Sequence, residues 1–219
     1  MNDDAETARS ILACPKGAEL TVEGVRQPID DLPDNVRDRA GTPMIVCLPD
    51  SPAVRAGELG REAVLSLRSG LRSTDSVSLA GPLRHLGSDE CPCCEGTQEY
   101  VIVQVADVVL NRDGLRVPVD LKAFSDPALM LNSGYLRRGE QHLNRCHGEH
   151  LRQAIAWRTG GRLDTIIAAQ ILTLTSTGVE LQYVTADGSH ILPVDFPDVA
   201  RGTEELAHFL RWALHPDLC

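Results

Sequence analysis

The sequence predicts an α+β fold: a small closed barrel of antiparallel strands over residues 1–125, followed by an α-β-β-β-α domain over residues 126–219. Three observations lead to this prediction. In the first part, short apolar or alternating runs are separated by turn sequences, as the strands of a barrel are. Ser125-Asp126-Pro127 marks a boundary between the parts. After it, one long helical pattern is followed by three strand-like runs and a final helical run.

The first part is expected to hold two short helices and several strands. Residues 3–13 carry apolar residues at helical spacing. Ser51 and Pro52 supply the N-cap and the first-turn proline of a second helix. Residues 30–41 are polar and turn-rich, and residues 87–97 are expected to be irregular. The expected strands are residues 19–25, 43–48, 62–68, 76–83, 100–110 and 115–121.

The second part is expected to begin with a long helix over residues 133–157. Three strands should follow at residues 165–175, 178–184 and 189–194, joined by the turns Ser176-Thr177-Gly178 and Ala186-Asp187-Gly188. Thr203 is expected to cap the last helix, because hydroxyl side chains accept hydrogen bonds from the first-turn amides. The inner face of that helix should carry Leu206, Phe209, Leu210 and Leu214.

Residues 141–158, QHLNRCHGEHLRQAIAWR, have the period of one amphipathic helix. Two imidazoles, those of His147 and His150, fall one turn apart within its apolar stripe, and His142 lies on the flank. The stripe, expected to be buried, consists of Leu136, Leu143, His147, His150, Leu151, Ala154 and Trp157. The opposite side carries Arg138, Arg145 and Arg152 and is expected to be solvated. Histidines at buried positions predict either polar packing or ligand binding.

The composition bounds the class of protein. Hydrophobic residues make up 42% of the 219 residues and charged residues 24%, as in a soluble protein with a core. The formal charge of -10 repels a phosphate backbone and argues against nucleic acid as a partner. Because neither a membrane-length apolar run nor a leader is present, we expect no membrane partner and a cytoplasmic location. Seven cysteines, an odd number, argue against a disulfide framework.

The second part resembles a known module. Its residues His142-Leu143-Asn144 and then His147 are followed by a strand pair, an Asp-Gly turn and the sequence LPVDFP at residues 192–197. This order is similar to the C-terminal domain that follows a split barrel in haem-utilisation proteins and glutamyl-tRNA reductase-binding proteins. The usual helix pattern there is H-[LM]-N-x-D-H, whereas this chain has Cys146 in place of the Asp and an additional His150. The first part resembles the split barrel of the pyridoxamine-phosphate-oxidase superfamily more loosely.

The resemblance implies a split β-barrel over residues 1–125, a small haem-utilisation-type domain over residues 126–219, and a homodimer joined through the barrels. For some relatives it also implies the binding or breakdown of haem, and for others a regulatory role in tetrapyrrole or iron metabolism.

The histidines are the first candidate ligand site. A neutral imidazole is a good iron ligand, and a neighbouring arginine pairs with a propionate carboxylate. His147 and His150, with His142 and Arg145 nearby, fit this role. Alternatively, His147 is a core histidine whose ring nitrogen bonds a backbone group. His190 is an independent candidate, expected on the face of its strand away from the helix or at the domain edge.

The sequence CPCC is a second candidate site. Cys91, Cys93 and Cys94, with His85 upstream, offer soft ligands for zinc, but the spacing lacks the second C-x₂-C arm of structural zinc sites. A reactive thiol and an inert loop are the alternatives. The other internal cysteines, Cys14, Cys47 and Cys146, are expected to be small buried hydrophobes.

A flavin site is the third candidate. A split barrel implies a phosphate-binding groove at the dimer seam, and Arg68, Arg72, Ser73 and Thr74 are the nearest match for FMN. The paired Arg and Lys pattern of flavin oxidases is absent.

Three functions therefore remain open: a haem-associated binding protein, extending to haem degradation; a flavin-dependent oxidoreductase; and a non-catalytic regulatory binding protein. No Ser-His-Asp set or carboxylate pair can be argued from spacing, so any enzyme chemistry would belong to a cofactor.

Overall fold

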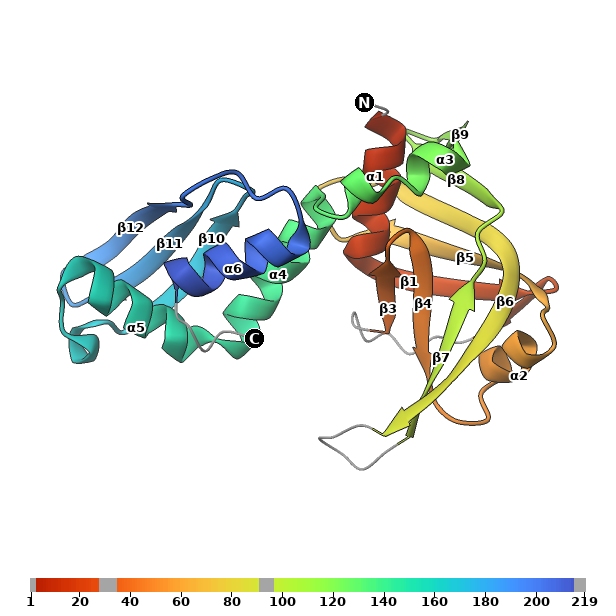
Figure 1. The fold of residues 1–219 in the computed structure, drawn as a ribbon, viewed down its shortest axis with the longest axis horizontal. Helices are drawn as coiled ribbons and strands as arrows, with labels where there is room; N and C mark the ends of the chain where they lie inside the picture. The colour runs from red at the N-terminus through yellow and green to blue at the C-terminus, as the bar shows by residue number, and fades with distance from the viewer. Residues whose placement is uncertain (1–2, 28–34, 91–96, 215–219) are drawn as a thin grey trace. The chain divides into compact units, whose positions relative to one another are not determined.

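The computed structural model describes residues 3–27, 35–90 and 97–214 (Figure 1). Helices and antiparallel strands occur together, so the α+β class predicted from the sequence is confirmed. The chain forms two compact units, Met1–Gly134 and Tyr135–Cys219. Within the described residues no helix is both long and apolar enough to cross a membrane.

Unit 1 is dominated by strands. Its helices are α1 (Asp3–Ala13), α2 (Pro52–Glu58), α3 (Leu121–Phe124) and the 3₁₀ turn η1 (Pro127–Leu129). Its strands are β1 (Pro15–Val22), β2 (Val25–Gln27), β3 (Val36–Arg39), β4 (Thr42–Cys47), β5 (Glu62–Ser69), β6 (Ser76–Glu90), β7 (Thr97–Val103), β8 (Asp107–Arg112) and β9 (Leu115–Pro118). All nine described strands belong to one sheet with the order β2-β1-β5-β6-β7-β4-β3, and β8 and β9 branch from β6.

The long strand β6 joins the two halves of this sheet. Residues 76–82 pair with β5, whereas residues 83–90 pair with β7, so the strand must bend between them. Gly81 occupies the bend at φ 156°, and a Cβ there would lie 2.0 Å from the carbonyl oxygen of Gln104. Only glycine fits, because it lacks that atom. The pairing of β6 with β7 shifts its register between His85 and Gly87, as at a β-bulge.

A closed apolar core fills unit 1. Its members include Ile11, Leu20, Leu65, Leu79 and Leu110, each with an exposed fraction of 0%. Every second residue of β5 is buried, namely Ala63, Leu65, Leu67 and Ser69. This is the alternation expected of a strand with one face against a core. Burial of these side chains is the main stabilising term of the unit.

A charged residue is buried beside this core. The side chain of Arg9, on α1, is 0% exposed and pairs with Asp38 of β3 at 2.9 Å. Its Nη1 donates to the carbonyl oxygen of Phe124 at 2.9 Å, and the Asp38 carboxylate accepts from the amide of Gly41 at 2.6 Å. The pair therefore ties α1 to the β3–β4 hairpin and to α3.

Three expectations for unit 1 were wrong. Residues 100–110, expected to form one strand, form the end of β7 and most of β8, separated by residues 104–106. Residues 36–39, within the polar stretch expected to be turns, form β3. Residues 87–90, expected to be irregular, continue β6. In each case pairing with a neighbouring strand decided the outcome, and local composition did not.

Unit 2 contains the helices α4 (Ser133–Cys146), whose first two residues lie in unit 1, α5 (Gly148–Thr159) and α6 (Thr203–Ala213), the 3₁₀ turn η2 (Leu163–Thr165), and the strands β10 (Ala168–Leu174), β11 (Gly178–Thr185) and β12 (Gly188–Asp195). The order β10-β11-β12 is the antiparallel meander predicted. Ile171, Leu181 and Val194 are buried on the side of the sheet that packs on the helices, and Phe196 contacts Phe209 of α6.

The predicted single helix over residues 133–157 is wrong. It breaks at His147, which has φ -123° and ψ 25° and is the N-cap of α5. The sequence Cys146-His147-Gly148 consists of poor helix formers, with glycine the least favourable of them. The break rotates α5 relative to the face assigned from α4. As a result Trp157, placed in the buried stripe, is 76% exposed. The last helix also differs, since Gly202 rather than Thr203 is its N-cap.

Candidate functional site

The break between α4 and α5 brings three imidazoles together. The ring centroids of His142 and His147 are 5.2 Å apart, and those of His147 and His150 are 5.5 Å apart. The Nδ1 atoms of His147 and His150 lie 3.4 Å from each other. His142 is exposed, whereas the other two are half-buried. We call these three residues the histidine cluster. The expectation that His147 and His150 lie fully inside a buried stripe is therefore wrong.

His147 occupies the N-cap position without capping the helix. An N-cap side chain usually accepts a hydrogen bond from an amide of the first turn, but the His147 side chain makes no such bond. Its ring instead faces that of His150, three residues later, at N3. The His147 side chain is half-buried, and the alternative of a core histidine whose ring nitrogen bonds a backbone group stays a prediction.

The surroundings of His147 favour its neutral form. Burial and the nearby imidazoles of His142 and His150 hold the pKa of His147 below its ordinary value near 6.5. A neutral imidazole offers a ring nitrogen lone pair to a metal or a donor, whereas an imidazolium does not. The surroundings of His147 thus favour the form of the ring that can act as a ligand.

A groove lies between α4 and β10, and none of the three histidines lines it. It has a volume of about 560 Å³ and is lined by Arg137, Glu140, Gln141, Asn144, Arg145, Gln170, Ile171 and Leu172. Arg145 follows His142 by one helical turn, so the two side chains leave neighbouring parts of the helix surface. Arg137 is ion-paired with Glu140. The groove thus combines two arginines, the Glu140 carboxylate that pairs with one of them, side-chain amides and the apolar Leu172.

Asn144 fixes the helix to the sheet at this groove. Its Nδ2 donates to the carbonyl oxygen of Ile171 at 2.9 Å, and its Oδ1 accepts from the Ile171 amide at 2.6 Å. The register of β10 shifts between Ile171 and Thr173, so a bulge is present where the side chain pairs with the backbone. The Asn of the His-Leu-Asn sequence is therefore structural. Sequence analysis missed this residue, although a polar side chain beside buried Leu143 was the available signal.

The arginines of the predicted solvated stripe differ from one another. Arg152 donates from Nε to the carbonyl oxygen of Ile166 at 2.8 Å and pairs with Glu149 at 2.7 Å. It therefore secures the segment that enters β10, and its assignment to a solvated stripe was wrong. Arg145 lines the groove and Arg138 lies near Tyr135.

His190 lies on the helix-packed side of the sheet, near the hairpin. It pairs across the sheet with Tyr183, two residues from Leu181, which is buried. Its ring stacks on that of Tyr183 at 5.0 Å, and its Nε2 lies 3.1 Å from the Thr185 hydroxyl. Of the two places predicted, the face away from the helix is therefore wrong, whereas the position near the hairpin does not contradict the domain edge; the ring has packing and polar partners.

The zinc candidates are only partly described. Cys91, Cys93 and Cys94 lie outside the described residues, and the Nε2 of His85 lies 2.6 Å from the Glu99 carboxylate. Among the described residues no group of three or more His, Cys, Asp or Glu side chains is arranged to hold a metal ion.

The internal cysteines differ from the expectation of burial. Cys14 is buried, Cys47 is half-buried, and Cys146 is exposed on the last turn of α4, so the expectation was wrong for Cys146. Burial raises the pKa of the Cys47 thiol, an environment that disfavours a reactive thiolate.

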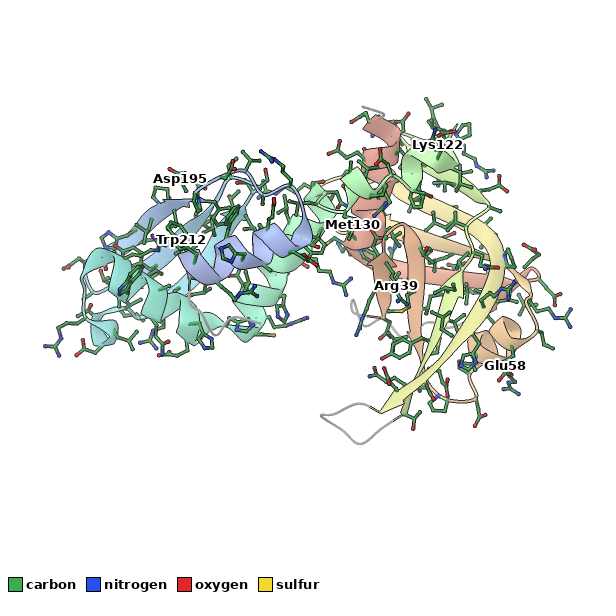
Figure 2. The ribbon with its side chains drawn as sticks, in the orientation of Figure 1. Arg39, Glu58, Lys122, Met130, Asp195 and Trp212 are labelled. Carbon is green, nitrogen blue, oxygen red and sulfur yellow. The ribbon has the colours of Figure 1, made fainter. Side chains whose placement is uncertain are left out.

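The residues proposed for FMN are on the surface. Arg68, on β5, and Arg72, Ser73 and Thr74, in the following turn, are all exposed. A groove of about 400 Å³ in unit 1 is formed by other residues, namely Arg37, Arg39, Met44, Leu86, Gly87, Ser88, Asp89 and Tyr100 (Arg39 is labelled in Figure 2).

Comparison with solved structures gives distant likenesses. No family model and no curated protein matches the sequence. The chain is similar to a haem-binding protein from Mycobacterium smegmatis, with 17% identity, a TM-score of 0.44 and 95% of each chain covered. It is also similar to a protein of unknown function from Agrobacterium tumefaciens C58, with 16% identity, a TM-score of 0.44 and coverage of 95% and 94%. Likeness at this level assigns neither a family nor a function.

Proposed function

We propose that this chain is a haem-associated binding protein whose unit 2 supplies the iron ligand. The observation that supports the proposal most directly is the histidine cluster, three partly exposed imidazoles gathered at one helix break. Histidine is the commonest protein ligand of haem iron in binding proteins. Haem iron needs one or two imidazoles, so the lack of a converged group of three metal ligands among the described residues does not count against it.

The candidate iron ligand is His150 or His147. The two half-buried rings are close enough to limit each other's rotation, and the lowered pKa of His147 favours its neutral form. His142 is the third, more exposed candidate. His190 is the weakest, because its ring stacks on Tyr183 and bonds Thr185.

The neighbouring groove matches the remainder of the ligand. The guanidinium of Arg145 would pair with a propionate, and charge-assisted hydrogen bonds of this kind are strong. Leu172, which is 36% exposed, offers an apolar contact to the macrocycle, whereas the Ile171 side chain is buried against the helices. The groove volume of about 560 Å³ lies within the range of small-molecule and cofactor sites. Haem, when bound, would supply iron redox chemistry, and the protein's own residues would hold and orient it.

The proposal includes the layout implied by the resemblance. We propose that unit 1 is a split barrel and that two copies associate through it. Supporting this, β6 is shared by two halves of one curved antiparallel sheet. Leu86 is 49% exposed beside the half-buried side chains of Met44 and Tyr100 on one outer surface. Light scattering of the purified chain should give twice the monomer mass, and a concentration-independent monomer would reject the association.

A haemin titration tests the binding function. Wild type should give a saturable Soret change at one haem per chain, and His150→Ala or His147→Ala should weaken binding about 10-fold or more, as ligand-shell losses do. Arg145→Ala should weaken it less. His190→Ala is the matched control, because it removes an imidazole that already has partners. An equal, non-saturating response in all variants would reject the proposal.

A further inference from the structure

The histidine cluster has a second geometric property that haem binding does not require. The Nδ1 atoms of His147 and His150 are 3.4 Å apart. Two nitrogen ligands of a tetrahedral ion, each at the zinc–nitrogen distance of about 2.0–2.1 Å, are separated by roughly 3.4 Å. In this structure the contact is a hydrogen bond between the two rings, and its length is also the spacing that an ion shared between them would impose.

We infer that His147 and His150 form the nucleus of a binding site for a borderline divalent cation of the Zn²⁺, Ni²⁺ and Cu²⁺ class. This inference does not rest on the proposed haem function. Imidazole suits these ions, whereas hard cations such as Mg²⁺ prefer oxygen ligands. These two imidazoles are the protein ligands of the site, in keeping with the finding that no group of three or more His, Cys, Asp or Glu side chains among the described residues is arranged to hold a metal ion. Water completes the coordination.

The backbone at the helix break supports this assignment. Because His147 is the N-cap of α5 and His150 is at N3, the two side chains leave the same end of the helix, where the capping box of other proteins places a reciprocal pair. Here no side-chain cap bond is made, so the positions do not serve the usual capping role. Gly148 follows His147. A Cβ at Gly148 would meet no atom within 4 Å, so packing does not require glycine at this position.

Protonation and local charge limit the affinity. Binding requires both Nδ1 atoms to be unprotonated, with the ring protons on Nε2, so one proton is displaced or moves between ring nitrogens. The helix N-terminus and Arg145 oppose a cation, whereas Glu149 is occupied by its ion pair with Arg152. We therefore expect a binding constant that weakens as the pH falls below the imidazole range, and weaker binding than at a Cys-rich structural site.

Isothermal titration with Zn²⁺ tests the inference. The full chain carrying Cys91→Ser, Cys93→Ser and Cys94→Ser should bind one Zn²⁺, which separates the histidines from the CPCC thiols. In this background His147→Asn and His150→Ala should each weaken binding about 10- to 100-fold, and the matched control His208→Ala should have no effect. Circular dichroism establishes that each variant is folded.

Two results would overturn the inference: no stoichiometric Zn²⁺ binding in the serine background, or binding of equal strength in wild type, His147→Asn and His150→Ala. The haem proposal is separable. A chain that binds Zn²⁺ at these residues but shows no saturable haemin response contradicts only the haem function, and the reverse outcome contradicts only the cation site. If both ligands bind, Zn²⁺ should compete with haemin, because they use the same nitrogens.

Discussion

The buried ion pair of Arg9 and Asp38 predicts a large and specific loss of stability in unit 1. Asp38→Ala removes the partner of a guanidinium whose side chain is 0% exposed, while leaving that charge buried. Nη1 keeps its bond to the carbonyl oxygen of Phe124, but the contacts at 2.9 and 3.0 Å are lost. Removing one partner of a buried pair costs about 3–5 kcal/mol, because an uncompensated charge remains.

Denaturant unfolding followed by far-ultraviolet circular dichroism measures this loss. Tryptophan fluorescence would not serve, because Trp157 and Trp212 both belong to unit 2 (Trp212 is labelled in Figure 2). The matched control is Glu23→Gln, which removes an exposed ion pair with Arg61, of side-chain exposure 55% and 49%. Such pairs contribute about 0–1 kcal/mol.

A double variant distinguishes an unpaired charge from lost packing. Arg9→Met combined with Asp38→Ala should be less destabilised than Asp38→Ala alone, since no charge is left buried. The reasoning is refuted if Asp38→Ala costs no more than Glu23→Gln, or if the double variant is less stable than the single one.

Three further predictions concern the glycine bend, the asparagine clamp and the histidine cluster. Gly81→Ala should prevent soluble expression, because its Cβ would lie 2.0 Å from a carbonyl oxygen. Gly114→Ala meets no atom within 4 Å and carries only the strain of a left-handed φ of 79°, about 1–2 kcal/mol, so it should still give folded protein; equal solubility of the two variants would contradict this. Asn144→Ala should destabilise unit 2 by about 1–3 kcal/mol or more, because the Ile171 amide and carbonyl lose their partners; tryptophan-detected urea unfolding measures it, and an unchanged midpoint would argue against the clamp. His147 has a folded-state pKa below the ordinary 6.5, so the unfolded chain binds more protons and unit 2 should lose stability as the pH falls through and below about 6.5; His147→Asn should flatten this dependence, and an identical slope in both proteins would count against the assignment.

The spacing of apolar residues along the sequence predicted the strands correctly where burial alternates from one residue to the next. The alternation of buried and exposed side chains along β5 was confirmed, and so was the meander β10-β11-β12 with its two turns. The period of the apolar residues did not predict the break at His147, because a 100° wheel treats α4 and α5 as continuous and His147-Gly148 costs only about 1 kcal/mol of helix propensity. That small cost was sufficient, since packing of α5 on β10 and β11 set its direction.

The candidate site was predicted in part. His142, His147 and His150 were singled out as a group, and the structure brings their rings within 5.2–5.5 Å, although through a helix break rather than a shared stripe. The groove could not be predicted, because it depends on the position of Ile171 and Leu172 on β10 relative to α4. The buried Arg9 was also missed, since its partner Asp38 is 29 residues away and no local pattern links them.

The most direct test of the central claim is the haemin dissociation constant of the double variant His147→Ala/His150→Ala, measured beside wild type and His190→Ala. The proposed function predicts one saturable site in wild type and in His190→Ala, and loss of that site in the double variant while its unit 2 remains folded by tryptophan fluorescence. Saturable binding of unchanged strength in the double variant would contradict the claim that the histidine cluster holds the iron.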